Sequence, residues 1–176
     1  MRLKTLTPET AQGKAREALA DIYQRHGSAG PMVRTMANSP ALLRGYLDLS
    51  RATKRVKLER NLSERVSIAV QAQIGCGYCL AAHSDAARAA GVSESEISEA
   101  REARSADPRV EALLEFAVTI LREPATIEDD DLDRLREYGY SDRQIADTVA
   151  LVALNQLTGS FNVVAGLEPA AAPAGV

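Results

Sequence analysis

Apolar residues recur along the chain at the three- and four-residue spacing of amphipathic helices, and no stretch alternates apolar and polar residues as a strand does. Proline, glycine and small polar residues divide this pattern into about eight or nine segments. The expected helices cover residues 8–25, 32–37, 40–55, 63–75, 76–90, one that begins at 93, one from 108 that ends before 124, one through 132–139, and one from 141 to about 159. The segment 145–157 is apolar around much of its circumference, which predicts a helix in the centre of the domain or at a subunit contact. We therefore predict an all-α fold with one domain over residues 1–176 and a frayed Ala/Pro-rich tail from about 168.

Several expected helix starts carry a capping signal. Thr7 precedes Pro8, which predicts a capped first helix. Ser93 and Ser141 each stand three residues before a Glu or a Gln, the spacing of a capping box. The acidic run 128–131 indicates a helix N-terminus rather than a metal site, because the helix macrodipole favours carboxylates there.

Composition and charge narrow the class of protein. The net charge is -3, with no basic stripe of the kind that a nucleic-acid-binding protein carries. The longest purely apolar run, 149–154, is too short for a membrane span, and the N-terminal MRLKTLTPET lacks the apolar core of a signal peptide. We therefore expect a cytoplasmic protein that binds neither nucleic acid nor membranes. In that reducing compartment, a close pair of cysteines is typical of redox, catalytic or metal chemistry rather than of a structural crosslink.

The residues that can carry chemistry lie between Glu64 and His83. At about 100° per residue, Cys76, Cys79 and His83 fall within one narrow arc of a helix, and Cβ atoms three residues apart are roughly 5–6 Å from each other, near the reach of a disulfide. A rise of about 1.5 Å per residue places Glu64 roughly 16 Å before the bend at Gly75 and His83 roughly 12 Å after it. An antiparallel helix hairpin would thus bring the carboxylate to the imidazole, which can take the proton of Cys79.

Two cues disagree about which cysteine attacks a substrate. The thiolate is the nucleophilic form, and either a helix N-terminus or a nearby histidine increases its fraction. Cys76 lies nearer the helix N-terminus, whereas Cys79 lies nearer His83. We assign the attack to Cys79 and the resolving role to Cys76.

This pattern, Glu-x11-Cys-x2-Cys-x3-His, resembles the alkylhydroperoxidase D-like branch of the carboxymuconolactone decarboxylase family. Glu64, Cys76, Cys79 and His83 match the active-site positions of that branch one by one, within a matched core of about Leu62–Gly91. The resemblance implies an all-helical homo-oligomer, commonly a trimer or hexamer. It also implies an antioxidant peroxidase that reduces small hydroperoxides without a bound cofactor or metal, using electrons from an external dithiol such as a lipoylated or thioredoxin-like protein.

Other interpretations of the cysteine pair stay open. It could serve a non-catalytic redox switch or interaction module, or it could be incidental to lactone decarboxylation, although the family's true decarboxylases lack the pair. Zinc usually takes four ligands, and Cys76, Cys79 and His83 supply three. Members that serve dihydrolipoyl-linked systems can carry a histidine between the cysteines, where this chain has Gly77–Tyr78, so the electron donor stays open. No pattern places the polar residues near the end of the last helix in the site; these are Asn155, Gln156, Ser160 and Asn162.

Overall fold

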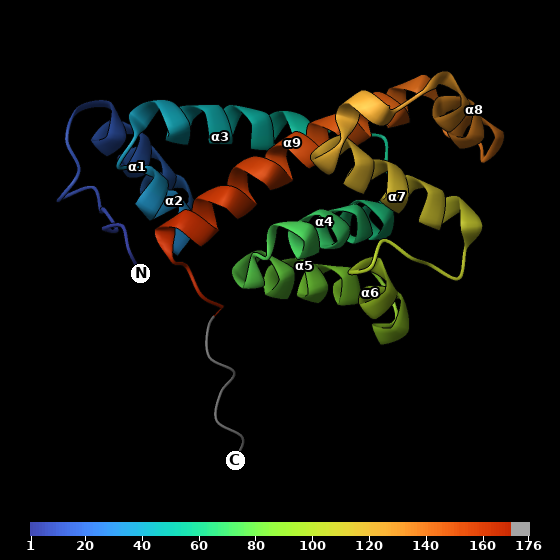
Figure 1. Cartoon of the computed structure of the whole chain (residues 1–176). Coiled ribbons are helices and arrows are strands. Elements are labelled where there is room, and N and C mark those ends of the chain that lie inside the picture. The colour runs from blue at the N-terminus through green and yellow to red at the C-terminus, as the bar shows by residue number, and fades with distance from the viewer. Residues whose placement is uncertain (170–176) are drawn as a thin grey trace, which may run out of the picture.

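The computed structural model describes residues 1–169, which form nine α-helices and one 3-10 turn and contain no strand (Figure 1). The elements are α1 (Gly13–His26), α2 (Pro31–Met36), α3 (Pro40–Thr53), α4 (Arg60–Ile74), α5 (Gly77–Ala89), α6 (Glu94–Ala100), α7 (Pro108–Arg122), η1 (Pro124–Thr126), α8 (Asp129–Glu137) and α9 (Asp142–Ala165). The predicted all-α, single-domain fold is confirmed. The tail predicted from residue 168 falls largely on residues 170–176, which lie outside the described residues.

Helix α4 is the centre of the molecule and packs against α5, α6, α7 and α9. Its residues from Val66 to Gln71 are all buried, so it has no solvent face along this stretch. Helix α9 runs across the molecule between α3 and the α4–α5 pair, as its apolar sequence predicts (Figure 1). By length and composition α9 is also apolar enough to cross a membrane, but its contacts with α3, α4 and α7 are typical of a core helix.

Two of the predicted helix starts are wrong. The chain at Thr7 makes a turn instead of a helix start: its N–H bonds to Thr10 Oγ1 at 2.8 Å and its carbonyl accepts from Ala11 N–H at 2.9 Å. Side-chain hydrogen bonds of this kind compete with helix formation, and α1 begins only at Gly13. Ser63 is not a cap either, because it lies inside the first turn of α4.

Helix α9 does not stop at Gly159 but continues to Ala165. Gly159 allows α9 to approach α4 closely. A Cβ at position 159 would clash with Gln71 Oε1 and lie 3.0 Å from Ile74 Cδ1. Gln71 cannot easily move away, because it is fully buried and its Nε2 donates to both oxygens of Asn155 at 2.8 and 3.0 Å.

We expect Gly159→Ala to destabilise the protein although alanine is the better helix former by about 1 kcal/mol. Overpacking against the pinned Gln71 amide should cost about 1–3 kcal/mol. Gly45 in α3 is the matched control, because a Cβ there meets nothing within 4 Å and Gly45→Ala should be neutral or stabilising. Urea unfolding of both variants measures the difference, and a Gly159→Ala protein as stable as Gly45→Ala would contradict this account of the helix crossing.

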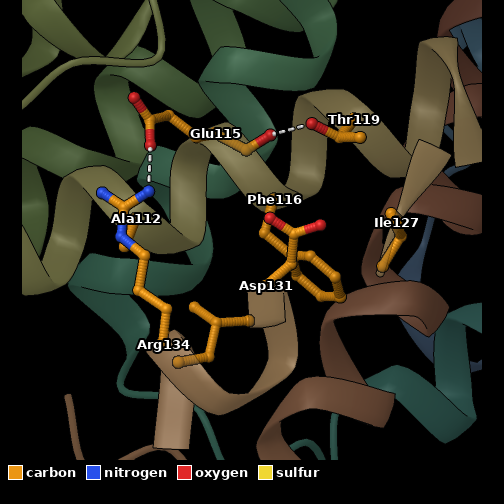
Figure 2. Close-up of a pocket in the computed structure, with 8 residues that line it drawn as sticks. Ala112, Glu115, Phe116, Thr119, Ile127, Asp131 and Arg134 are labelled. Carbon is orange, nitrogen blue, oxygen red and sulfur yellow. Dashed lines mark hydrogen bonds and ion pairs between the residues drawn. The ribbon is translucent and has the colours of Figure 1, made fainter. Parts of the chain in front are cut away.

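A cavity of about 250 Å³ lies between α7 and α8, with the Glu115–Arg134 ion pair (3.3 Å) at its wall (Figure 2). Its lining residues are Ala112, Glu115, Phe116, Thr119, Ile127, Asp131, Arg134 and Leu135. The acidic run begins α8 as predicted, with a reciprocal capping box between Glu128 and Asp131. None of the lining residues is a cysteine or histidine, so the predicted redox chemistry does not lie in this cavity.

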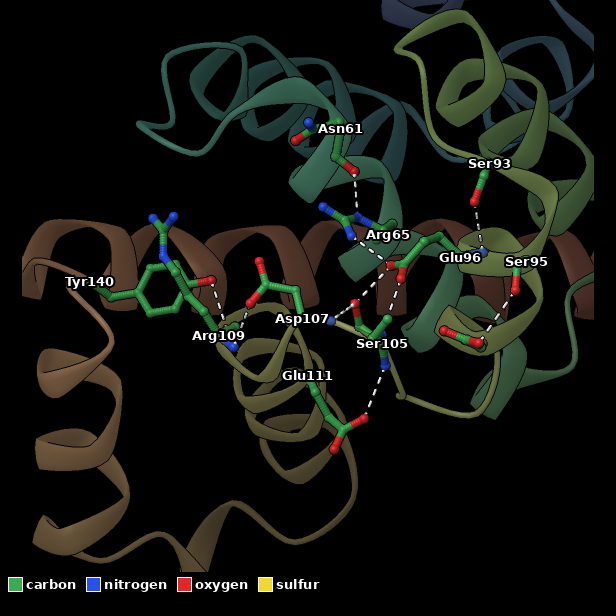
Figure 3. Close-up of polar contacts among 12 residues, drawn as sticks. Asn61, Arg65, Ser93, Ser95, Glu96, Ser105, Asp107, Arg109, Glu111 and Tyr140 are labelled. Carbon is green, nitrogen blue, oxygen red and sulfur yellow. Dashed lines mark hydrogen bonds and ion pairs between the residues drawn. The ribbon is translucent and has the colours of Figure 1, made fainter.

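The capping box at Ser141 forms as predicted, whereas the one at Ser93 forms only in part. Ser93 Oγ accepts from the Glu96 N–H at 3.2 Å, but the Glu96 carboxylate turns away from it (Figure 3). It accepts instead from Arg65 Nη1 at 2.8 Å, Ser105 Oγ at 2.7 Å and the Ala106 N–H at 3.1 Å. Glu96 thereby ties α6 to α4 and to the loop before α7.

This cluster predicts acid-sensitive stability. Burial alone would raise the pKa of the Glu96 carboxyl, but hydrogen bonds from Ser105, Ala106 and Arg65 outweigh burial and lower it. A lowered folded-state pKa stabilises the fold above the unfolded value of about 4.3, and this contribution is lost as the pH falls through the folded value. Glu96→Gln should therefore reduce the free energy of unfolding by about 1.5–3 kcal/mol at neutral pH, and the deficit should shrink below about pH 4.3.

Urea unfolding at neutral and acidic pH tests this expectation. The control is Glu102→Gln, which removes an exposed carboxylate paired with Arg104 and should cost no more than about 1 kcal/mol. A deficit for Glu96→Gln that stays constant with pH would show that the lost charge is not its cause.

Candidate active site

The two cysteines lie at the bend between α4 and α5. Gly75 ends α4 in the left-handed conformation (φ 77°), and the Cys76 N–H donates to Gln71 O at 3.2 Å. Cys76 was predicted to lie inside the helix, but it is the N-cap of α5. There its Sγ accepts a hydrogen bond from the Cys79 N–H at 3.3 Å. The cysteines are paired as a disulfide with Cα atoms 5.4 Å apart, and both are almost completely buried. The geometry expected for a Cys-x-x-Cys redox pair is therefore present.

The α4–α5 hairpin brings Glu64 and His83 together, as the helix arithmetic predicts. Glu64 Oε2 lies 2.8 Å from His83 Nδ1, a direct contact that needs no bridging water. Since an ionised carboxylate only accepts hydrogen bonds, His83 donates through Nδ1–H and keeps its lone pair on Nε2. On the outer side, Arg60 Nε lies 3.8 Å from Glu64 Oε1. The pair thus holds His83 in the tautomer that can accept a proton.

A cavity of about 320 Å³ lies between α3, α4, α5 and α9, with a contribution from α2. Its lining residues are Met32, Tyr46, Ser50, Ser63, Glu64, Ser67, Tyr78, Cys79, Ala82, His83, Leu151, Leu154, Asn155 and Thr158. Glu64, Cys79 and His83 therefore share one wall, whereas Cys76 is not part of the lining. A molecule in this cavity therefore lies next to Cys79, the cysteine that we assign to the attack.

The cavity is also lined by the apolar side chains of Met32, Leu151 and Leu154 and by two of the chain's five tyrosines, Tyr46 and Tyr78. Burial raises the pKa of Tyr46, and a hydrogen bond with Ser50 opposes this effect. The Tyr46 phenol consequently stays neutral at physiological pH. The apolar side chains of the lining can contact the organic part of a small molecule.

No sequence pattern placed the amides of α9 in the site, and the structure corrects this. Asn162 Nδ2 donates to Cys79 Sγ at 3.2 Å, across 83 residues of sequence. Asn155 lines the cavity, and its Nδ2 donates to Ser67 Oγ at 3.0 Å. The two asparagines are seven residues apart on α9, so they share one face of the helix. This seven-residue spacing is the sequence signal that could have indicated a shared polar face on α9. His83, in contrast, makes no hydrogen bond to Cys79 among the described residues.

No group of three or more His, Cys, Asp or Glu side chains in residues 1–169 is arranged to hold a metal ion.

Residues 40–123 match the model of the carboxymuconolactone decarboxylase family, just under half of the chain. The matched range runs from the start of α3 to the end of α7, and it contains Glu64, Cys76, Cys79 and His83. Comparison with curated proteins gives no match.

Solved structures extend the likeness over almost the whole chain. An alkylhydroperoxidase AhpD core structure, an uncharacterised peroxidase-related protein from Ralstonia eutropha JMP134, is 21% identical with a TM-score of 0.81 and covers 97% of this chain and 92% of its own. An uncharacterised peroxidase-related protein from Silicibacter sp. TM1040 is 21% identical with a TM-score of 0.74, covering 90% and 85%. The debrominase Bmp8, as a cysteine-to-alanine variant in complex with 2,3,4-tribromopyrrole, is 19% identical with a TM-score of 0.73, covering 97% and 92%. At these identities the likeness establishes an AhpD-like fold.

Proposed function

We propose that this protein is a thiol-dependent peroxidase that reduces small organic hydroperoxides through a dithiol–disulfide cycle of Cys76 and Cys79. The observation that carries the proposal is the shared wall of the cavity: Cys79, which can pair with Cys76, stands there beside a histidine whose tautomer is fixed by Glu64. A nucleophile, a base and a group that orients the base are the parts that covalent catalysis needs.

The reaction begins when His83 takes the proton of the Cys79 thiol. The thiolate attacks the terminal oxygen of the hydroperoxide, so that an S–O bond forms and the O–O bond breaks. The sulfur is oxidised by two electrons, and the alkoxide leaves with the proton from His83 as an alcohol. The Cys76 thiol then attacks the sulfenic sulfur, which forms the disulfide and releases water.

An external dithiol completes the cycle by two thiol–disulfide exchanges and is itself oxidised to a disulfide. A lipoylated or thioredoxin-like protein has this chemistry, and we propose such a donor. A reducing supply of this kind is typical of the cytoplasm, where we place the protein. We further propose that the protein is a homo-oligomer, a trimer or hexamer; this is supported by the exposed apolar residues Val149, Val163 and Val164 on α9.

The test is a count of free thiols in the reduced protein before and after one equivalent of an organic hydroperoxide, followed by addition of excess dithiol. We expect the loss of both thiols in each chain and continued hydroperoxide consumption while dithiol remains. Thiols that stay unreactive would overturn the proposal.

Other outcomes point to the alternatives. Stoichiometric oxidation without turnover, accompanied by a change in assembly, would indicate a redox switch. Lactone decarboxylation that survives replacement of both cysteines by serine would indicate that the pair is incidental. Bromopyrroles belong in the same assay, because a protein of this fold is a debrominase.

A further inference from the structure

Two buried amides of α9 face the site, and they are bonded in different ways. Asn155 uses both ends of its side chain: Oδ1 accepts from Gln71 Nε2 at 2.8 Å, and Nδ2 donates to Ser67 Oγ and to Leu151 O, each at 3.0 Å. Asn162 is 1% exposed and is equally enclosed. Its Nδ2 donates to Cys79 Sγ, but its Oδ1 has no hydrogen-bond partner among residues 1–169.

The amide of Asn162 differs from that of Asn155 in the atom to which it donates. The unbonded oxygen alone does not distinguish Asn162, because the buried oxygens of Asn61 and Gln71 also lack a partner among residues 1–169. Asn162 is held instead by a sulfur, which is a weak acceptor as a disulfide or thiol and a strong one as a thiolate. The hydrogen bond of Asn162 would therefore gain most strength in the state in which Cys79 reacts.

We propose that the Asn162 amide is the hydrogen-bond donor that stabilises the Cys79 thiolate and so makes Cys79, rather than Cys76, the attacking sulfur. The assignment of the attack rests on the proposed function, whereas the hydrogen bond to the thiolate does not.

Burial of Cys79 gives such a donor a role beside the base His83. Cys79 is 5% exposed, and burial among apolar groups raises the pKa of a thiol. The titratable groups around it are Glu64 from α4, Tyr46 from α3, and Tyr78, His83 and Cys76 from α5 and its cap. The α9 residues of the cavity are uncharged.

Among residues 1–169, these other neighbours donate no hydrogen bond to the sulfur of Cys79. The Glu64 carboxylate opposes a second negative charge, and it uses the Nδ1–H of His83. The hydrogen bond from the Cys79 N–H goes to Cys76 Sγ rather than to the sulfur of Cys79. The Asn162 amide is thus the polar donor that the described residues direct at this sulfur.

The experiment measures the Cys79 thiol in a Cys76→Ser background, without any hydroperoxide. Thiolate absorbance followed against pH gives its pKa, and the rate of alkylation by iodoacetamide at neutral pH gives its reactivity. We expect the pKa to be about 1–2 higher in Asn162→Ala, and alkylation at neutral pH to be about tenfold slower or more. Asn162→Asp keeps the shape but replaces the donor by a carboxylate, so it should raise the pKa at least as far. Asn162→Ser, which retains a donor, should raise it less.

Asn155→Ala is the matched control from the same face of α9. It removes a side-chain amide that is hydrogen-bonded at both ends, so it should lower the stability of the protein. The pKa of Cys79 should nevertheless stay near its value in the parent. A Cys79 pKa that is the same in Asn162→Asp and the parent would overturn the proposal, as would equal shifts from Asn155→Ala and Asn162→Ala. Since the readout uses no peroxide or donor, it can fail while the peroxidase reaction holds, and it can succeed where that reaction fails.

Discussion

A Cys79→Ser protein should reduce hydroperoxide no faster than solution does, a loss of about 10³-fold or more, whereas Cys76→Ser should complete a single turnover and stop. The first variant lacks the sulfur of Cys79, the cysteine that lines the cavity together with His83. The second keeps that sulfur but has no partner for the disulfide, so the sulfenic acid accumulates. Hydroperoxide consumption with and without dithiol, together with the mass of the protein after one equivalent, separates these results.

The two variants are matched, because each removes one sulfur from the same disulfide. We expect a gain of one oxygen in Cys76→Ser and no change of mass in Cys79→Ser. The opposite result, with oxidation only in Cys79→Ser, would assign the attack to the cysteine at the N-cap of α5. In that case the helix macrodipole would outweigh His83 and the α9 amide.

Much of this site follows from local geometry, which is why the sequence predicts it. Cys79 and His83 occupy one surface of α5 because residues four apart are neighbours, and Cys76 directly precedes this helix as its N-cap. The contact of Glu64 with His83 follows from comparable heights along two helices joined at Gly75, and the structure gives 2.8 Å between Glu64 Oε2 and His83 Nδ1. In both cases the rise and twist of a helix, together with one tight bend, are sufficient to predict which residues lie close together.

The contribution of α9 could not be derived in this way. Asn162 reaches Cys79 from 83 residues away, and the register of α9 on α4 depends on how Gly159 fits against Gln71. Glycine at that position indicates a helix end when it is judged by propensity, because glycine is a poor helix former. Only the packing of two helices shows that the missing Cβ allows them to approach. The seven-residue spacing of Asn155 and Asn162 marks a polar face, but it does not say which helix that face meets.

The same limit explains the errors at helix starts. Thr7 and Ser63 both have the residue type of an N-cap, and each has a competing local arrangement in the fold. Thr7 closes a turn with Thr10, and Ser63 lies one turn inside a helix that Glu59 precedes. Glu96 has the spacing of a capping box, but Arg65 and Ser105 from other segments offer its carboxylate stronger partners. Residue type limits the possible caps, and tertiary contacts select among them.

His83→Ala should reduce the rate of hydroperoxide consumption by about 10²–10⁴-fold at neutral pH, the range of a lost general base. Glu64→Gln should cost less, because a glutamine oxygen can still accept from Nδ1–H while the negative charge that favours the protonated imidazole is gone. The control is His26→Ala: His26 is the other histidine of the chain, lies at the exposed end of α1, and should leave the rate unchanged.

The dependence of these rates on pH distinguishes a base from a structural side chain. Without His83, the thiolate forms only as the pH approaches the pKa of the Cys79 thiol itself, so the rate of His83→Ala should climb towards that of the parent at alkaline pH. A side chain that merely supports the cavity would lower the rate by the same factor at every pH. Parallel pH profiles for His83→Ala and the parent would therefore remove His83 from the proton transfer, and would leave the Asn162 amide as the group that activates the sulfur.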